Sequence, residues 1–289
     1  MRLLLSAMCA LLLTAVAAEA EEDASQDKRQ YTLFNPVPDS LMRPMATDRP
    51  DATESPYTLD AGHVQIELDF FVYTRDRETV NGQDTRLRVF NLMPFNVRIG
   101  LNHNTELDII FEPLVFQRTE FFVIPPFSVE REGFGDTTLR IKRNLWGNDG
   151  GDTAFAILGF ITLPTNQDDI GIDSAEGGVI LPFSKDLEGA WSFGAQLEFD
   201  IVRNLADTGF EAGFSQTAVI GYEVSEQVGA FLEIFSFFTS ESAFDWIGTV
   251  NLGFTWAITA DVQLDLGIRV GISSAAPDSE LFAGGSFRF

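Results

Sequence analysis

Charged, polar or glycine residues occupy every second position along several stretches of this sequence, alternating with apolar ones. In residues 260–272, for example, Asp261, Asp265 and Arg269 lie between valine, leucine and isoleucine. If such a face lines a lumen, opposite charges across it can select or orient solutes. The alternative is that the charges form structural salt-bridge ladders that fill a narrow lumen. The candidate lumen-lining residues are Glu67, Asp69, Arg86, Arg88, Arg98, Glu106, Asp108, Arg140, Lys142, Glu198, Asp200, Asp261, Asp265 and Arg269.

A second group lies upstream, where Asp48, Asp51 and Glu54 recur at every third residue. Carboxylates in such a group are suitable ligands for a hard cation. The same residue types also cap turns, or pair with a neighbouring base such as Arg49. We predict turns and ion pairs here, and no metal site is assigned.

Catalysis has little support in the sequence. A lipase-type reaction, which the twelve-stranded outer-membrane phospholipase A performs, needs a serine that a histidine activates. The chain has only His63 and His103, neither in a nucleophile motif nor in a metal-ligand cluster. The glycine-rich stretch at 147–152 lacks the lysine of a phosphate-binding loop. We therefore predict no enzyme activity and no cofactor.

The N-terminus predicts export. Arg2 precedes an apolar run, and Ala18-Glu19-Ala20 fits a signal-peptide cleavage site, so residues 1–20 are predicted to be removed. The only cysteine, Cys9, lies within this signal, which leaves the mature chain without a disulfide or a cysteine ligand. A net charge of −24 with few lysines argues against nucleic-acid binding.

Two regions follow the signal. Residues 21–60 are polar and rich in proline, which predicts an extended periplasmic leader or plug-like segment. Residues 61–289 alternate apolar and polar side chains almost throughout, which predicts strands. The expected strands lie near 62–75, 85–101, 104–117, 134–145, 152–163, 174–184, 189–203, 209–223, 227–240, 244–256, 260–272 and 280–289, with Pro94 and Pro182 interrupting two of them.

These segments favour an all-β fold, a single transmembrane antiparallel barrel of about twelve strands. Most reach the roughly 9–11 residues that a tilted strand needs to cross a bilayer. Short connections alternate with longer ones, the arrangement of outer-membrane barrels, which leaves both termini on the short-turn, periplasmic side. A soluble β-sandwich shows the same alternation. The barrel is favoured by long apolar faces, by aromatic residues near segment ends and by mixed charges on the polar faces.

The chain ends with Phe287 and Phe289 on one face of the last segment. A terminal aromatic residue in this pattern resembles the assembly signal of bacterial outer-membrane proteins. We therefore expect the barrel-assembly machinery and outer-membrane lipid as partners, in a Gram-negative bacterium.

The sequence also resembles the MetA-pathway phenol-degradation family of outer-membrane barrels. The resemblance covers the first half of the mature chain. It is carried by Thr47-Asp48-Arg49-Pro50-Asp51, Glu54-Ser55-Pro56, Gly62-His63, Arg98-Ile99-Gly100-Leu101, Glu106-Leu107, Gly133-Phe134-Gly135-Asp136, Leu139-Arg140-Ile141-Lys142 and Leu163-Pro164-Thr165. It implies an outer-membrane channel or transporter for small, aromatic or hydrophobic solutes. The alternative is a closed barrel that serves as a structural or surface-binding protein without transport.

Overall fold

The computed structural model describes residues 27–80, 83–204, 208–240 and 246–289. The predicted signal peptide therefore lies outside the described residues. From residue 27 onward, the leader contains two short 3-10 turns, η1 (Lys28–Gln30) and η2 (Asp39–Leu41), and isolated β-bridges at Thr32. Among the described residues, no helix has the length and apolar character that crossing a membrane requires.

Strands make up nearly all of the remainder. They are β1 (Val64–Val80), β2 (Gln83–Leu92), β3 (Phe95–Asn102), β4 (Thr105–Phe111), β5 (Leu114–Phe121), β6 (Phe127–Gly133), β7 (Thr137–Trp146), β8 (Thr153–Leu163), β9 (Glu176–Asp186), β10 (Trp191–Arg203), β11 (Phe210–Glu223), β12 (Val228–Thr239), β13 (Ile247–Thr259), β14 (Val262–Gly271) and β15 (Ser279–Arg288).

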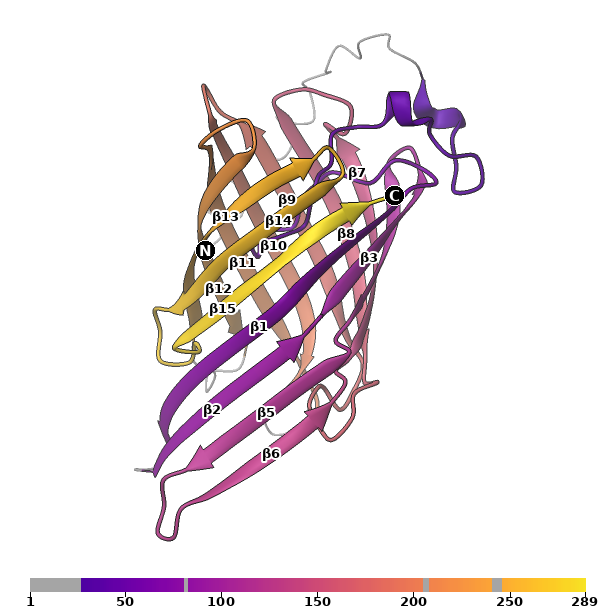
Figure 1. Cartoon of the computed structure of the whole chain (residues 1–289). Coiled ribbons are helices and arrows are strands. Elements are labelled where there is room, and N and C mark those ends of the chain that lie inside the picture. The colour runs from indigo at the N-terminus through magenta and orange to yellow at the C-terminus, as the bar shows by residue number, and fades with distance from the viewer. Residues whose placement is uncertain (1–26, 81–82, 205–207, 241–245) are drawn as a thin grey trace, which may run out of the picture.

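These strands form one antiparallel sheet that closes on itself (Figure 1). β1 pairs with β15 on one side and with β3 on the other, and β4 pairs with β7. Within the described residues, the closed ring contains twelve strands, which confirms the predicted fold. Closure matters in a membrane because it leaves no strand edge unpaired in lipid.

Three of the spanning runs are interrupted at about the same height. Met93 and Pro94 separate β2 from β3, residues 112–113 separate β4 from β5, and residues 134–136 separate β6 from β7. Met93 has a positive φ of 55°, and Pro94 cannot donate a ladder hydrogen bond. Pro94 thus breaks its strand as predicted. Pro182 does not break β9, in which it lies buried with its neighbours still paired.

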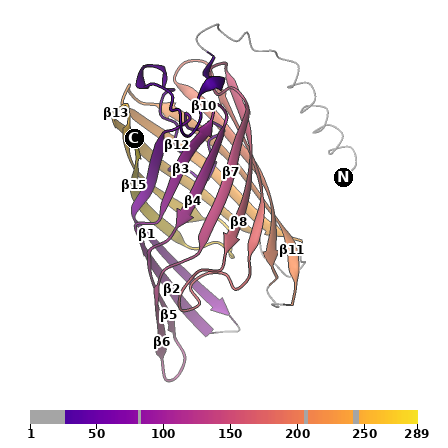
Figure 2. The same ribbon diagram turned by 90° about the vertical axis from the view of Figure 1, so that its right-hand side faces the viewer.

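Beyond these interruptions, residues 71–80 of β1 continue with β2, β5 and β6 as a four-stranded sheet, which we call the rim extension. It protrudes past the rest of the wall, at the end opposite the C-terminus (Figures 1 and 2). In the described chain, β6 pairs with β5 alone. The two ends of the barrel therefore differ, and we call them the terminal end and the extended end.

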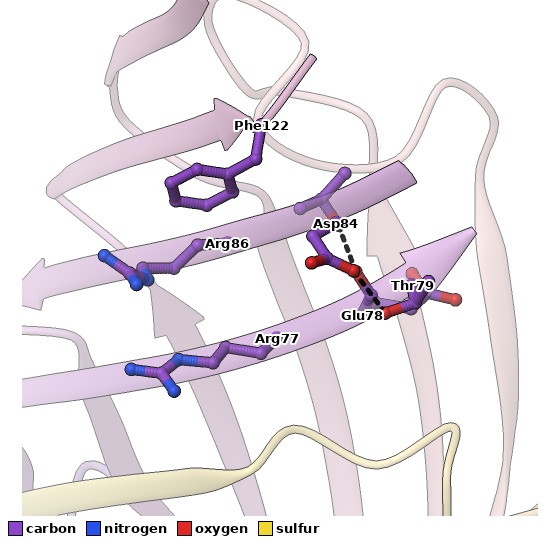
Figure 3. Close-up of a pocket in the computed structure, with 7 residues that line it drawn as sticks. Arg77, Glu78, Thr79, Asp84, Arg86 and Phe122 are labelled. Carbon is purple, nitrogen blue, oxygen red and sulfur yellow. Dashed lines mark hydrogen bonds between the residues drawn. The ribbon is translucent and has the colours of Figure 1, made fainter. Parts of the chain in front are cut away.

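The interruptions also change which side chains face outward, and this corrects the prediction for Arg86 and Arg88. Asn91 and Val115, on neighbouring strands, are buried, whereas Phe90 and Phe116 are 37 % and 38 % exposed. Arg86 and Arg88 share the face of Phe90, and so they lie on the outer surface of the rim extension. Figure 3 shows Arg86 and Arg77 extending to the same side. If the strict alternation continued through Met93 and Pro94, both arginines would face the lumen. The break at these two residues turns them outward instead.

Elsewhere the wall has an apolar outside and a polar inside. On β12, Leu232 and Ile234 are each 55 % exposed, while Glu233 between them is 0 % exposed. A soluble protein would bury the two aliphatic side chains and expose the carboxylate. The inverse arrangement is that of a spanning barrel, whose outer face meets lipid.

Candidate functional site

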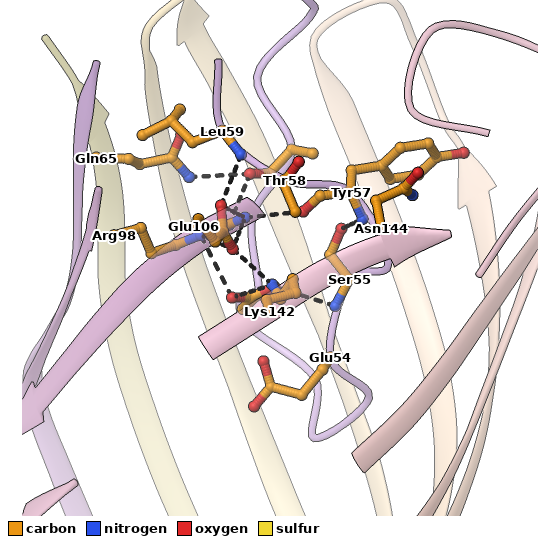
Figure 4. A network of polar contacts seen from close by, with 12 residues as sticks. Glu54, Ser55, Tyr57, Thr58, Leu59, Gln65, Arg98, Glu106, Lys142 and Asn144 are labelled. Carbon is orange, nitrogen blue, oxygen red and sulfur yellow. Dashed lines mark hydrogen bonds and ion pairs between the residues drawn. The ribbon is translucent and has the colours of Figure 1, made fainter. Parts of the chain in front are cut away.

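Residues 46–59 of the leader lie inside the ring at its terminal end, and we call them the lumen segment (Figures 1 and 4). His63 holds the preceding chain at the mouth, since its Nε2 lies 2.7 Å from the Val37 carbonyl oxygen and its Nδ1 lies 3.2 Å from that of Phe289. His103 contacts Asp149 at 3.3 Å, in neighbouring turns. Both histidines thus have structural partners at the terminal end.

Asp48 belongs to an ion-pair cluster of five side chains, of which Figure 4 labels Arg98, Glu106 and Lys142. Its carboxylate accepts hydrogen bonds from Lys142 Nζ at 2.6 and 2.8 Å, and Arg98 Nε lies 3.4 Å away. Arg98 also pairs with Glu67 at 2.8 Å and with Glu106 at 2.9 Å. All five side chains are at most 5 % exposed. Removing one partner of such a buried set is costly because it leaves a charge uncompensated.

Arg49 makes the second attachment, to strands β1 and β14. Its Nη2 lies 2.7 Å from Asp69 Oδ1 and 2.7 Å from Asp265 Oδ1, and its Nε donates to Asp265 Oδ2 at 3.1 Å. Asp69 belongs to β1 and Asp265 to β14, so one guanidinium of the leader neutralises two carboxylates of the wall. A guanidinium suits this role because its donors are arranged in a planar fork.

The innermost turn of the lumen segment is held by β10, β11, β12 and β7. Glu233 accepts hydrogen bonds from Ala52 N at 2.9 Å and from Thr53 Oγ1 at 2.6 Å. Gln196 Oε1 accepts from Glu54 N at 2.7 Å, and the Glu54 carboxylate pairs with Arg140. The segment is therefore attached around most of the lumen.

The acidic residues spaced by three do not converge on a cation. Asp48 pairs with Lys142, Glu54 pairs with Arg140, and Asp48 Oδ1 also accepts from Ser55 N at 3.1 Å, which closes the turn. In the described chain, the acidic group with ligand atoms within 4.8 Å of one another is Asp48, Glu106 and Asp108. The ammonium of Lys142 contacts two of these three, so a basic side chain takes the place of a metal.

Burial changes the titration of the leader's carboxyl groups. Desolvation, together with the nearby charge of Glu233, raises the pKa of Asp51 well above its ordinary value. Desolvation likewise raises the pKa of Glu54, against the opposing effect of Arg140. Desolvation would also raise the pKa of Asp48, but the charges of Arg98 and Lys142 together hold it below its ordinary value.

Four predicted residues make smaller contacts. Arg269 pairs with Glu280, stacks over the Phe282 ring at 4.5 Å and reaches the Pro50 carbonyl at 3.5 Å. Glu198 accepts a hydrogen bond from Gln196 at 2.9 Å, and Asp200 follows on the same inner face. Asp261 differs, because it lies in the turn between β13 and β14, is 45 % exposed, and pairs with Arg288 at 2.6 Å.

Sequence reasoning missed a set of phenylalanines on the inner face. Each is paired with, or two residues from, a buried residue of the inner face, and so it also faces inward. They lie toward the extended end, past the lumen segment, and are Phe160, Phe235, Phe237 and Phe282. The Phe282 ring passes within 2.4 Å of where a side-chain carbon would stand at Gly267, so that glycine makes room for it. A signal was present in β12, where phenylalanines occupy both faces: Phe235 and Phe237 lie on the inner face and Phe238 on the outer one.

The C-terminal strand closes the ring. Phe287 is paired with Ile66 and Val262, and Phe289 exchanges backbone hydrogen bonds with Val64 at 2.8 and 3.2 Å. The role of these two phenylalanines in assembly stays a prediction.

One solved structure shares this barrel fold, and two others are less similar to it. The COG4313 outer membrane channel from Pseudomonas putida F1 is 13 % identical, with a TM-score of 0.61 over 84 % of this chain and 100 % of that one. The monoaromatic hydrocarbon channel CymD is 8 % identical, with a TM-score of 0.45 over 78 % of this chain and 87 % of that one. The Ralstonia pickettii toluene transporter TbuX is 9 % identical, with a TM-score of 0.40 over 78 % and 88 %.

At these identities the first structure supports the shared barrel fold alone, and the other two carry no argument. No curated protein matches the sequence. A family match is more specific, because it covers residues 47–289 and so includes the lumen segment together with the whole barrel. The chain belongs to the family described as "Putative MetA-pathway of phenol degradation".

Proposed function

We propose that this protein is an outer-membrane channel for small aromatic or hydrophobic solutes, and that the lumen segment is its gate. The proposal rests on one observation. Phenylalanine rings line the lumen between the lumen segment and the extended end, and ion pairs hold the lumen segment in place across the lumen. Aromatic rings bind other rings through offset or edge-to-face contacts. The polar attachments of the segment can be exchanged for water, as a gate requires.

The proposed orientation places both termini in the periplasm. Barrels of this class have their short turns on the periplasmic side. The connections at the terminal end, such as residues 103–104 and 260–261, are indeed short. A solute would then enter at the extended end, meet the phenylalanines and leave past the displaced segment.

The lumen charges favour neutral or cationic solutes over anions. Carboxylates outnumber bases on the described inner face: the acids include Glu67, Asp69, Glu106, Asp108, Glu198, Asp200, Glu233, Asp265 and Glu280, and the bases include Arg98, Arg140, Lys142, Arg269 and Arg288. A single-sign excess in a narrow lumen attracts counter-ions and repels like charges. Neutral phenols therefore fit the lumen better than aromatic carboxylates do.

A reversible disulfide tests whether the segment is the gate. Thr53 Oγ1 and Thr217 Oγ1 lie 2.6 Å apart, and the mature chain has no cysteine to interfere. The double variant Thr53→Cys, Thr217→Cys is expected to be silent in planar bilayers when oxidised and to conduct after reduction. The single variant Thr53→Cys serves as the control, because it cannot form the bond.

Conduction by the oxidised double variant, with the bond verified by mass, would refute a gate that must leave its seat. Silence of the reduced protein, the single variant and the wild type alike would instead favour the closed structural barrel.

The raised pKa of Asp51 predicts that the gate opens more readily as the pH rises. The seated segment favours the protonated carboxyl, and release into water restores the ordinary pKa, so the seated state binds more protons. Seating is therefore most stable below the ordinary carboxyl pKa and weakens as the pH rises through the raised one. Glu54 acts in the same direction, whereas the ion pair of Asp48 is lost only in stronger acid.

Conductance measured from pH 4 to 8 is expected to increase, by at most about tenfold per pH unit for one titrating carboxyl. Asp51→Asn should flatten this increase, while Asp39→Asn, at an exposed leader position, should leave it unchanged. A decrease in conductance with pH would contradict this assignment.

A further inference from the structure

The outer face of the rim extension carries its side chains in rows that cross three strands. Directly paired residues share a face, so the register defines each row. The rows, in order toward the extended end, are Phe71–Leu92–Leu114, Tyr73–Phe90–Phe116, Arg75–Arg88–Arg118 and Arg77–Arg86–Glu120. The surface thus changes from apolar to aromatic to basic, with about 7 Å between successive rows.

This basic surface, which we call the arginine ladder, is unusual in a chain with net charge −24. It also opposes like charges directly, because Arg75 faces Arg88, Arg88 faces Arg118, and Arg77 faces Arg86. Like charges at directly paired positions destabilise a sheet. An anion that bridges the guanidinium groups would remove this repulsion.

The carboxylates beside the arginine ladder neutralise only part of its positive charge. Glu120 pairs with Arg86 at 3.3 Å, Arg88 at 3.5 Å and Arg118 at 3.2 Å, so three bases share one acid. Glu130, on β6, pairs with Arg118 at 3.2 Å. Asp84 and Glu132 share this outer face; Asp84 accepts from Thr79 at 2.6 Å. Within the described chain, no carboxylate lies within ion-pair distance of Arg75 or Arg77.

A hollow of about 340 Å³ lies at the tip of the ladder (Figure 3). Arg77, Arg86 and Phe122 line it together with Thr79, Thr85 and the carboxylates of Glu78 and Asp84. The Arg86 guanidinium lies 5.2 Å from the centre of the Phe122 ring. The stacked ring fixes the orientation of this guanidinium. Two arginines on one side of a hollow match the several acceptor oxygens of a phosphate.

We propose that the arginine ladder binds the phosphate groups of a lipid in the outer leaflet, the phosphorylated glycolipid lipid A. Its acyl chains would lie along the apolar row, its sugars beside the aromatic row and its phosphates between Arg75, Arg77, Arg86 and Arg88. The order of the rows follows the order of these groups in a leaflet, where aromatic side chains occupy the interface and clustered bases attract anionic headgroups. The choice of leaflet rests on the orientation proposed above.

Binding can be measured by native mass spectrometry of the full mature protein in detergent, with three lipids offered separately: lipid A, its dephosphorylated form and phosphatidylglycerol. Wild-type protein is expected to prefer lipid A. The double variant Arg75→Gln, Arg77→Gln should bind it at least about tenfold more weakly, through the loss of charge-assisted hydrogen bonds. Because these two arginines have no acidic partner, the variant breaks no described ion pair.

Arg143→Gln is the matched control, since Arg143 also faces outward but lies at the terminal end, where it contacts Thr105. It should bind lipid A as the wild type does. A second readout concerns folding: without lipid, the double variant should melt no lower than the wild type, because it loses a repulsion, and lipid A should raise the melting temperature of the wild type alone.

Equal binding of lipid A by the double variant and the wild type would overturn the proposal. So would equal binding of the dephosphorylated lipid or of phosphatidylglycerol, or full displacement of lipid A by inorganic phosphate at millimolar concentration, which would indicate a site for the free anion. None of these measurements requires conduction, so a failure of the channel proposal would be seen separately.

Discussion

Mature protein without residues 21–58 is expected to conduct continuously in planar bilayers and to admit solutes to liposomes. The deletion removes the lumen segment except for its last residue, Leu59, and so removes Asp48, Arg49 and the turn that Glu233 holds. If the segment is seated in about 99 % of intact molecules, time-averaged conductance should rise on the order of a hundredfold. The emptied lumen keeps its excess of carboxylates, so the open channel should select cations over anions.

A shorter deletion, of residues 21–41, keeps the lumen segment and is the matched control. It should conduct far less than the longer deletion. Both proteins must show heat-modifiable migration, which verifies a folded barrel. A folded but silent longer deletion would refute the channel and leave a barrel that the wall residues themselves close.

Arg49→Met is expected to open the channel without shortening the chain. The substitution keeps most of the side-chain length but leaves Asp69 and Asp265 unneutralised beside the seated segment. Asp265 is 0 % exposed, so its desolvation is uncompensated as long as the segment stays in place. Breaking a buried pair in this way costs about 3–5 kcal/mol. The seated state should therefore lose roughly 10²- to 5 × 10³-fold in population relative to the released state.

Single-channel open probability measures this effect. Arg49→Lys should fall between the variant and the wild type, since it restores the charge but not the fork of donors. Arg29→Met, at an exposed leader position, is the matched control and should behave as the wild type. An open probability unchanged by Arg49→Met would show that the ion pair does not hold the gate.

Both predictions join two features that the sequence shows only separately. The Asp48–Glu54 region and the alternating charges of the strands can each be recognised, because turn residues and period-two alternation are local patterns. Their pairing is not local: Arg49 and Asp265 are 216 residues apart, and Asp48 and Lys142 are 94 apart. The sequence suggested that lumen charges face one another or the solute, whereas many of them bind the leader.

The sequence by itself determined the barrel, its twelve strands and the short turns at one end. Strand period, segment length and loop length are local properties that can be read directly from the order of residues. Where alternation was broken, the sequence alone misled: Met93 and Pro94 introduce an irregularity that reverses the faces beyond it, and so turn Arg86 and Arg88 outward. Only the closed tertiary structure decided that the leader enters the lumen, that Glu233 and Arg49 hold it there, and that phenylalanines line the remaining space. The physical reason is that a lumen forms only when the first and last strands meet, so the partners of an inward side chain are set by closure and not by its neighbours in sequence.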